Sequence, residues 1–208
     1  MEHPSRVHAG EEPELEASQT LGIIQPLKEP YSTLVLFLGL CGRRIEEAIG
    51  IKPTDVEDNN VLRIRRLICN GQVEELAEEE QQVLPLDQRD HAELVRRLRV
   101  LGKDREWVFH SRKGSPINPG NARRRHLQPA AEAAGIEIGG WHDFRHALIR
   151  KMRRGGVHPV VVSAVVGHKR VELAPEVYAR ATLDEKRQTL GVVRRDLLPI
   201  GSKSTPVQ

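Results

Sequence analysis

The chain has 208 residues, with 32 basic and 29 acidic side chains and a net charge of +3, so it is long enough for one domain with a hydrophobic core but not for two large ones. Aromatic residues make up only 3% of it, which argues against modules that stack bases on aromatic side chains. The longest apolar run, residues 34–41, is too short to cross a bilayer, and no basic-then-apolar leader is evident, so we expect a cytoplasmic protein.

The first part of the chain predicts a tail followed by two helices. Residues 1–28 lack hydrophobic periodicity and are rich in Glu, Pro, Ser and His, which is typical of a flexible segment. The pattern then becomes helical: Pro30 suits a first helical turn, and residues 34–40 are typical of a core helix. A second helical segment covers residues 43–49, and Pro53 stops it.

The next part predicts a small antiparallel sheet. Residues 61–68 alternate apolar and basic side chains over much of their length, and Asn70-Gly71 is a strong signal for a hairpin turn. We expect the acidic residues 74–80 to interrupt the return before a last strand at residues 83–86.

Helices dominate the remainder. Asp87 is a candidate N-cap for a helix that ends at Gly102, and residues 107–109 form a short buried run. Further helices are predicted over residues 118–135, 141–156, 159–166 and 183–198. The sum is a mainly α fold with a small antiparallel β-sheet (α+β), divided into a tail (1–28), a domain (29–182) and a C-terminal helix with its tail (183–208).

Basic residues are concentrated in two places. Residues 142–170 hold seven Lys and Arg against one acid, Asp143, and a second cluster is Arg123-Arg124-Arg125. Such a local surplus is expected of a face that binds a polyanion, and a solvated helix flank is the alternative. Arg outnumbers Lys 24 to 8, which suits bidentate phosphate contacts, although genome composition produces the same bias.

The densest polar group is the sequence from His142 to His146. On a helix, His142, Arg145 and His146 lie on one face, so two imidazoles and a guanidinium converge. This set suits an anion better than a metal ion, because a metal site needs more neutral or anionic ligands and no arginine among them. A capped helix start with solvated side chains is the alternative.

Three more features stand out along the chain. Arg43 and Arg44 directly follow the buried segment, an unusual place for charge, although a surface helix start would also explain them. His168 comes just after an apolar helix and a glycine, and Tyr178 is an isolated aromatic residue ten positions later.

In this order, these residues resemble the tyrosine recombinases, also called the phage integrase family, over roughly residues 29–198. Each short motif is weak alone, but together and in register they are specific. Residues 42–47 match the family's Gly-x-Arg-Ile-x-Glu-like turn, which points to Arg44. The other matches are His142, Arg145 and His146 in a His-x-x-Arg-His box, His168 in a Leu-Gly-His box, and Tyr178 as the nucleophile.

The resemblance implies the fold of a recombinase catalytic domain and site-specific DNA recombination or integration, expected of a mobile element. Arg44 and Arg145 would clamp the phosphodiester oxygens, and His168 would add a hydrogen bond. Tyr178 would attack phosphorus to form a 3′-phosphotyrosyl link and leave a 5′ hydroxyl. His142 is the candidate base, because a phenol with a pKa of about 10 needs help to lose its proton. No metal ion and no nucleotide cofactor are required.

The expected partner is double-stranded DNA. The candidate DNA-binding side chains are Arg43, Arg65, Arg66, Arg123, Arg124, Arg125, His146, Lys169 and Arg170. The final helix, with Leu190, Val193 and Leu197 on one stripe, is expected either to pack on its own domain or to support self-association on DNA.

The sequence departs from the family pattern in two respects. Members usually carry a hairpin Lys that protonates the leaving 5′ oxygen, but no Lys occurs here between Lys52 and Lys103. Arg65 and Arg66 are poor proton donors, and loss of a general acid typically costs about 10²–10⁴-fold in rate. The usual DNA-embracing domain also has no counterpart in the 43 residues before Arg44, so we expect a catalytic domain alone, with weaker and more salt-dependent DNA binding.

Two other hypotheses remain at this point. One is a degenerate recombinase that keeps the phosphate site but only binds DNA. The other is a small helical interaction domain in which the motifs are coincidental.

Overall fold

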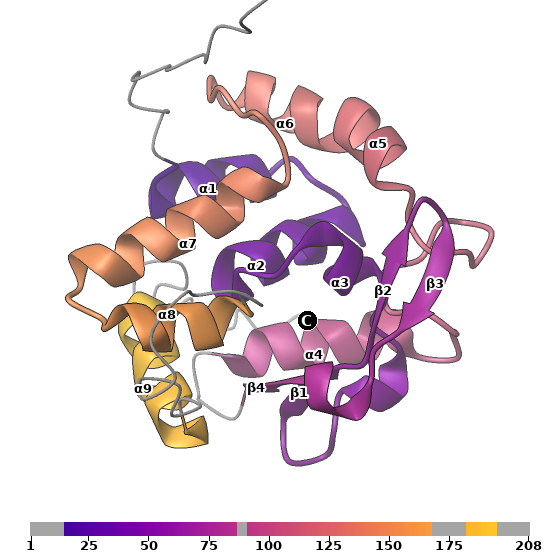
Figure 1. The fold of residues 1–208 in the computed structure, drawn as a ribbon. Coiled ribbons are helices and arrows are strands. Elements are labelled where there is room, and N and C mark those ends of the chain that lie inside the picture. Colours follow the sequence, from indigo (N-terminus) through magenta and orange to yellow (C-terminus); the bar gives the residue numbers. More distant parts are fainter. Residues whose placement is uncertain (1–14, 87–90, 168–181, 195–208) are drawn as a thin grey trace, which may run out of the picture.

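The computed structural model describes residues 15–86, 91–167 and 182–194, which form a mainly helical fold with a bent β-hairpin at one side (Figure 1). The helices are α1 (Ala17–Ile24), α2 (Tyr31–Cys41), α3 (Ile45–Ile49), α4 (Ala92–Gly102), α5 (Pro119–Ala122), α6 (Gln128–Ala133), α7 (His142–Arg154), α8 (Pro159–Val166) and α9 (Leu183–Arg194). The strands are β1 (Val61–Ile64), β2 (Arg66–Cys69), β3 (Gln72–Glu75) and β4 (Gln82–Pro85). The predicted fold class, mainly α with a small antiparallel sheet, is confirmed.

Helix α2 lies at the centre of the core. Every residue from Ser32 to Cys41 is buried, as expected of a helix that is apolar on all sides. Helices α1, α3, α4, α7 and α9 all contact it. The predicted core helix is therefore confirmed, and the helices that surround it bring the distant segments of the chain together.

The predicted tail is wrong over residues 17–24, which form α1. Ile23 and Thr20 are buried where this helix packs against α2 and α6. The Gln19 side chain accepts a hydrogen bond from the Glu16 backbone at 2.7 Å and so caps the first turn. A helix of eight residues is marginal alone, so its stability comes from tertiary packing that composition does not reveal.

The predicted hairpin is confirmed, and it is bent. Strand β1 pairs with β4, β2 pairs with β3, both antiparallel, and the Leu76 amide donates to the Arg65 carbonyl at 2.8 Å between the two pairs. Asn70 and Gly71 have φ values of 51° and 80°, as a tight hairpin turn requires.

The acidic segment was expected to interrupt the return strand, and this is only partly right. Glu74 and Glu75 belong to β3 and pair with Leu67 and Arg66. The interruption is limited to residues 76–81, which include a short 3-10 turn (Glu78–Glu80). The strand continues through acidic residues because β3 is fully exposed, so its side chains need not be apolar.

The helix predicted over residues 118–135 contains a π-turn that the sequence pattern did not indicate. Residues 123–127 form this turn between α5 and α6, and the three segments follow one another without a break. Pro129 lacks an amide hydrogen and its ring would clash with the Arg125 carbonyl in a regular helix, which accounts for the wider turn.

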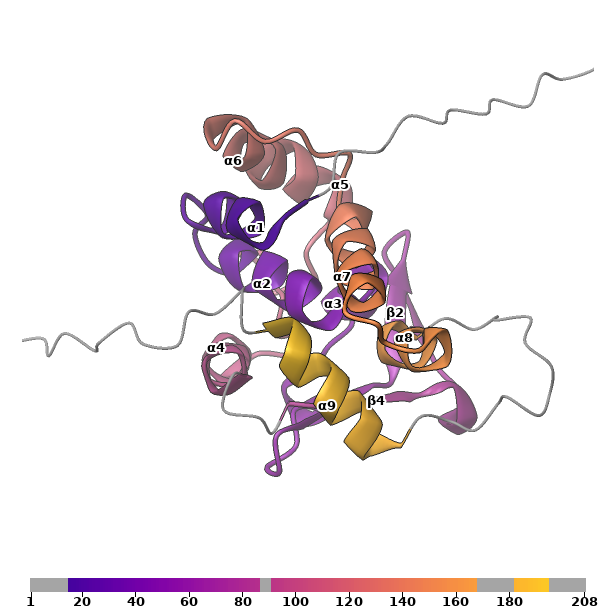
Figure 2. The same ribbon diagram turned by 90° about the vertical axis from the view of Figure 1, so that its left-hand side faces the viewer.

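The remaining predicted helices agree with the structure where it describes them. Helix α4 ends at Gly102, α7 ends before Gly155, and α8 has the predicted bounds, whereas Asp87 lies outside the described residues. Helix α9 packs in cis against α8, β4, α2 and α7 (Figure 2). In the ranges that the structure describes, no helix is both long enough and apolar enough to span a membrane.

Candidate functional site

The ends of α2 and α8 and the start of α3 meet beside α7. Gly42 ends α2 in a left-handed conformation with φ of 59°, and α3 begins three residues later, at Ile45. A Cβ at Gly42 would lie 2.6 Å from the Leu148 side chain on α7, so this close approach requires glycine. Gly167 ends α8 in the same way, with φ of 74°. The two glycine turns place the ends of α2 and α8 beside α7.

Arg145 joins these two helix ends. It lies in the first turns of α7 with only 3% of its surface exposed. Its Nη1 donates to the carbonyl oxygens of Gly42 and Val166, both at 2.6 Å. Carbonyls at helix C-termini carry partial negative charge and attract a cation. The other terminal nitrogen, Nη2, is buried and has no hydrogen-bond partner among the described residues.

Arg44 approaches the same place from α3. It is the N-cap of α3, and 38% of its side chain is exposed. Its Nη1 lies 3.5 Å from the carbonyl oxygen of Gly167 and 3.5 Å from Oε1 of the buried Glu47. Glu47 also accepts the Arg44 amide at 3.0 Å, which fixes the first turn of α3. The sequence motif contained Glu47, but the burial that makes it the partner of Arg44 was not predicted.

Positive charge exceeds negative charge here. Among the described residues, Arg43, Arg44 and Arg145 share one carboxylate, that of Glu47. The pKa of Arg145 falls to about 10, mainly because of burial and also because of the neighbouring charge of Arg44, while Glu47 acts in the opposite direction. Burial also lowers the pKa of Arg43. An anion bound beside Arg145 Nη2 and Arg44 would offset this excess.

The two histidines of the box lie on the outside of α7. His142 and His146 are exposed, and their ring centroids are 6.4 Å apart. Arg145, predicted on the same face, is instead turned into the core between them. Asp143 Oδ2 accepts the amides of Gly139 and Gly140, at 2.6 and 3.3 Å, and so holds the loop that leads into α7.

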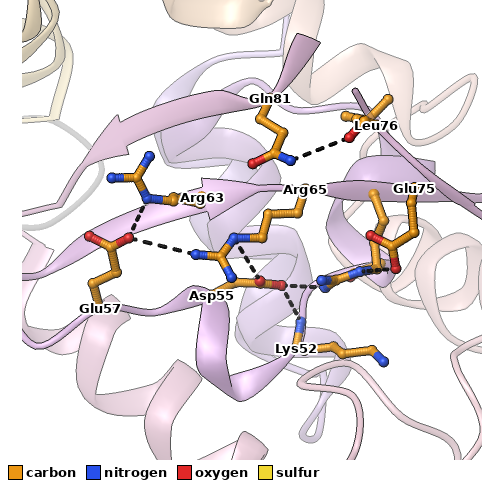
Figure 3. A network of polar contacts seen from close by, with 10 residues as sticks. Lys52, Asp55, Glu57, Arg63, Arg65, Glu75, Leu76 and Gln81 are labelled. Atoms are coloured by element: carbon orange, nitrogen blue, oxygen red, sulfur yellow. Dashed lines mark hydrogen bonds and ion pairs between the residues drawn. The ribbon is translucent and has the colours of Figure 1, made fainter. Parts of the chain in front are cut away.

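The hairpin arginines are engaged with acids (Figure 3). Arg66 is buried and donates to Asp55 at 2.6 Å, to Glu75 at 2.9 Å and to the Gly50 carbonyl at 3.2 Å. Arg65 is about one-third exposed and lies 3.7 Å from Asp55 and 3.9 Å from Glu57. These contacts favour a structural role for Arg66.

Arg43 is also turned inward. Its exposed fraction is 1%, and it donates to the Gln82 side chain on β4 and to the Val165 carbonyl on α8. The structure therefore places this predicted DNA contact inside the protein. Nothing in the sequence distinguished it from the neighbouring Arg44.

The three arginines of the π-turn are exposed. Arg124 Nη2 donates to Asn121 at 2.8 Å, and the His126 ring stacks on Tyr31 with centroids 3.8 Å apart. This stack ties the turn to the start of α2. Burial lowers the pKa of His126, and the charge of Arg125 adds to the effect, so the ring is neutral near pH 7. Sequence reasoning did not find this contact.

The structure brings Arg44 and Arg145 to the end of α8, with the exposed His142 and His146 on α7. His168, Lys169, Arg170 and Tyr178 lie outside the described residues, which stop at Gly167 and resume at Thr182. Leu197 lies outside them as well. In the described ranges, no three His, Cys, Asp or Glu side chains are grouped so as to hold a metal ion.

Comparisons with known proteins find integrases that are similar to this chain in sequence or in fold. An integrase from Streptomyces ambofaciens is 32% identical over 75 residues, a stretch that spans 35% of this chain and 19% of that protein. The Tn1549 transposon integrase, solved in complex with circular intermediate DNA, is similar in fold with a TM-score of 0.64 at 18% identity, over 88% of this chain and 68% of that one. The lambda integrase catalytic core gives 0.54 at 18% identity, over 76% and 96%. The family model described as "Phage integrase family" matches residues 13–185, so the chain belongs to the phage integrase family of tyrosine recombinases.

Proposed function

We propose that the chain carries out site-specific recombination or integration on double-stranded DNA, by cleaving and rejoining strands through a 3′-phosphotyrosyl intermediate. The observation that carries this proposal is the buried Arg145, whose Nη2 has no partner among the described residues. It lies beside Arg44, where positive charge exceeds negative charge. Family membership supports DNA recombination as the reaction.

The arginines suit a phosphodiester in the transition state. Two carbonyl bonds hold Arg145 in place, so Nη2, which has no partner within the described part of the chain, is oriented before the substrate arrives. Arg44 is partly exposed, and its side-chain contacts with Glu47 and the Gly167 carbonyl are long, at 3.5 Å, so it can turn toward a second phosphate oxygen. Together they would offset the charge that develops as phosphorus becomes pentacoordinate.

The remaining steps follow from the family resemblance. The Tyr178 oxygen forms a bond to phosphorus as the bond to the 5′ oxygen breaks, and His142 takes the phenolic proton. The leaving 5′ oxygen takes a proton from solvent, because the hairpin holds no Lys, and departs as a hydroxyl. His168 donates a hydrogen bond to the phosphate. Attack by the 5′ hydroxyl of another strand on the link restores a phosphodiester and releases Tyr178.

We propose that DNA lies along the exposed basic residues. The proposed contacts within the described ranges are Arg65, Arg123, Arg124, Arg125 and His146. Lys169 and Arg170, which lie outside those ranges, are proposed from the sequence alone. Arg43 and Arg66 are left out because both are buried. We also propose a mobile-element origin and a cytoplasmic location. Helix α9 packs in cis, so self-association on DNA would require it to leave this position or to use another surface.

A second candidate function is DNA binding without cleavage. The hairpin holds no Lys, and Arg65 and Arg66 are paired with Asp55, Glu57 and Glu75. A guanidinium is a poor general acid, and an ion-paired one is poorer still. This observation favours a slow or inactive enzyme that retains the phosphate site.

Covalent trapping on nicked duplex DNA separates the two functions. We expect the wild-type chain, but not Tyr178→Phe, to form a protein–DNA adduct stable to denaturant. A substrate with sulfur at the 5′ bridging position needs no proton on its leaving group, so it should react about 10²–10⁴-fold faster than normal DNA if only the acid is missing. Absence of an adduct with both substrates would favour the DNA-binding function.

A further inference from the structure

Three consecutive carbonyl groups at the end of α8 each meet a different arginine. Val165 accepts from Arg43, Val166 from Arg145 at 2.6 Å, and Gly167 lies 3.5 Å from Arg44 Nη1. We propose that Arg43 is a positioning residue that locks the last turn of α8 against the turn between α2 and α3. This inference rests on the proposed function, in which Arg44 and Arg145 bind the phosphate and His168 follows Gly167 in the chain.

Arg43 connects three elements that are far apart in sequence. It lies in the turn between α2 and α3, donates through Nη1 to Gln82 on β4, and donates through Nη2 to Val165 on α8. Gln82 lies 39 positions and Val165 122 positions away. Since Arg44 is the next residue, any movement of this turn relative to α8 also moves Arg44.

Stability alone does not explain an arginine at this position. Its exposed fraction is 1%, and no carboxylate accepts a hydrogen bond from it among the described residues. A buried charge without a paired carboxylate is costly, and an apolar side chain of similar volume is often at least as stable. What arginine supplies, and an apolar residue cannot, is two directional hydrogen bonds in one rigid plane.

The local packing leaves little freedom for this contact to shift. A Cβ at Gly167 would overlap Oε1 of Gln82 and lie 2.6 Å from Nη1 of Arg43. The backbone of Gly167 therefore lies directly against the Arg43–Gln82 pair. The same pair restrains the chain immediately before His168, which would have to reach the phosphate from this end of α8.

The test compares Arg43→Met with Arg43→Lys and with a control, Leu98→Ala. The control removes a buried side chain from α4, whereas the two hydrogen bonds of Arg43 go to β4 and α8. In a single-turnover trapping assay with the 5′-bridging sulfur substrate at saturating DNA, Arg43→Met should form adduct about 10²-fold more slowly than wild type, as expected of a misplaced phosphate site. DNA affinity should stay unchanged, because Arg43 does not reach the surface. Arg43→Lys should recover part of the rate, since an ammonium group can donate to Val165 or to Gln82.

A second measurement does not depend on cleavage. Amide hydrogen exchange in the last turn of α8 should be faster in Arg43→Met than in Leu98→Ala when both are compared at equal stability. Gln82→Leu should show a smaller increase at the same amides, and it serves as the test if Arg43→Met does not fold.

If wild type forms no adduct but exchange changes as expected, the proposed function fails and the locking role stands. The role of Arg43 would be overturned if Arg43→Met had the same exchange and adduct-formation rates as the control. It would also be overturned if Arg43→Met lost DNA affinity while its rate of adduct formation stayed unchanged.

Discussion

Arg66 and Arg145 are both buried, with exposed fractions of 7% and 3%, but their guanidinium groups meet different partners. Arg66 donates to two carboxylates, Asp55 and Glu75, and to one carbonyl. Arg145 donates to two carbonyls, leaves Nη2 without a partner among the described residues, and has other arginines as its neighbours.

The difference shows that burial alone does not identify a structural arginine. A buried guanidinium whose charge is matched by carboxylates is already paired inside the protein and needs no external anion. A buried guanidinium held by carbonyls alone has no carboxylate to match its charge, so burial first and neighbouring arginines second lower its pKa, and an external anion becomes favourable. Charge balance therefore separates the hairpin network from the candidate phosphate site.

The largest expected effect concerns Arg66, whose charge is matched by carboxylates. Asp55→Asn should lower the free energy of unfolding by about 3–5 kcal/mol, because it leaves Arg66 buried without its closest charged partner. Urea unfolding would measure this, with an unchanged m-value as the check on two-state behaviour. Glu75→Gln is the matched control: 63% of the Glu75 side chain is exposed, so its loss should cost at most about 1 kcal/mol. Equal effects of the two changes would contradict the view that Asp55 balances the buried charge.

The next effect concerns Arg145, which donates to carbonyls instead of carboxylates. Arg145→Lys should slow adduct formation by about 10²–10³-fold, since an ammonium group cannot hold two carbonyls and a phosphate oxygen in one plane. It should also abolish the rise in melting temperature that added phosphate produces by binding the folded state. Arg66→Lys is the control and should retain that rise despite lower stability. A rise that survives in Arg145→Lys but not in Arg66→Lys would reverse the assignment.

Much of the fold could be predicted because local chemistry determines it. Asn70-Gly71 gave the hairpin turn, and the Pro159 and Gly167 boundaries gave α8. The motifs also predicted that Arg44 and Arg145 would meet, although they come from segments about 100 residues apart. The likeness to a known family, rather than periodicity, made that prediction.

The orientation of the arginines could not be predicted. In the alternating segment 61–68, a buried basic residue and an exposed one look alike, and the acid that pairs with Arg66 lies 11 positions upstream, in a turn. Arg43 and Arg44 are adjacent and identical in type, but only the first points inward. Their difference depends on Gln82 and Val165, which only tertiary structure brings near.

Exposed arginines, unlike buried ones, should contribute to the salt dependence of DNA affinity. Arg124→Ala should lower the slope of log affinity against log salt concentration by about 1, the value for one lost phosphate contact. Arg66→Met should leave that slope unchanged, because its guanidinium group is buried. Binding titrations with duplex DNA at several salt concentrations would measure both slopes. A reduced slope in Arg66→Met would show that the hairpin network opens on DNA.

The smallest effect is expected for an ion-pair network on the surface. Glu93 on α4 accepts hydrogen bonds from Arg96 at 2.8 Å and from Arg97 at 2.7 Å, and the Arg96 hydrogen bond is the main reason that its pKa falls from 4.5 to about 2. A carboxylate whose pKa is lowered by folding stabilises the protein above pH 4.5, and this contribution disappears as pH falls through about 2. Because 41% of the Glu93 side chain is exposed, Glu93→Gln should lower the free energy of unfolding at pH 7 by less than about 1 kcal/mol. The difference from wild type should shrink between pH 4.5 and pH 2, and it should also shrink in 1 M salt, which screens exposed charges. The Asp55→Asn effect should persist in that salt, because screening does not reach a pair that is buried inside the protein.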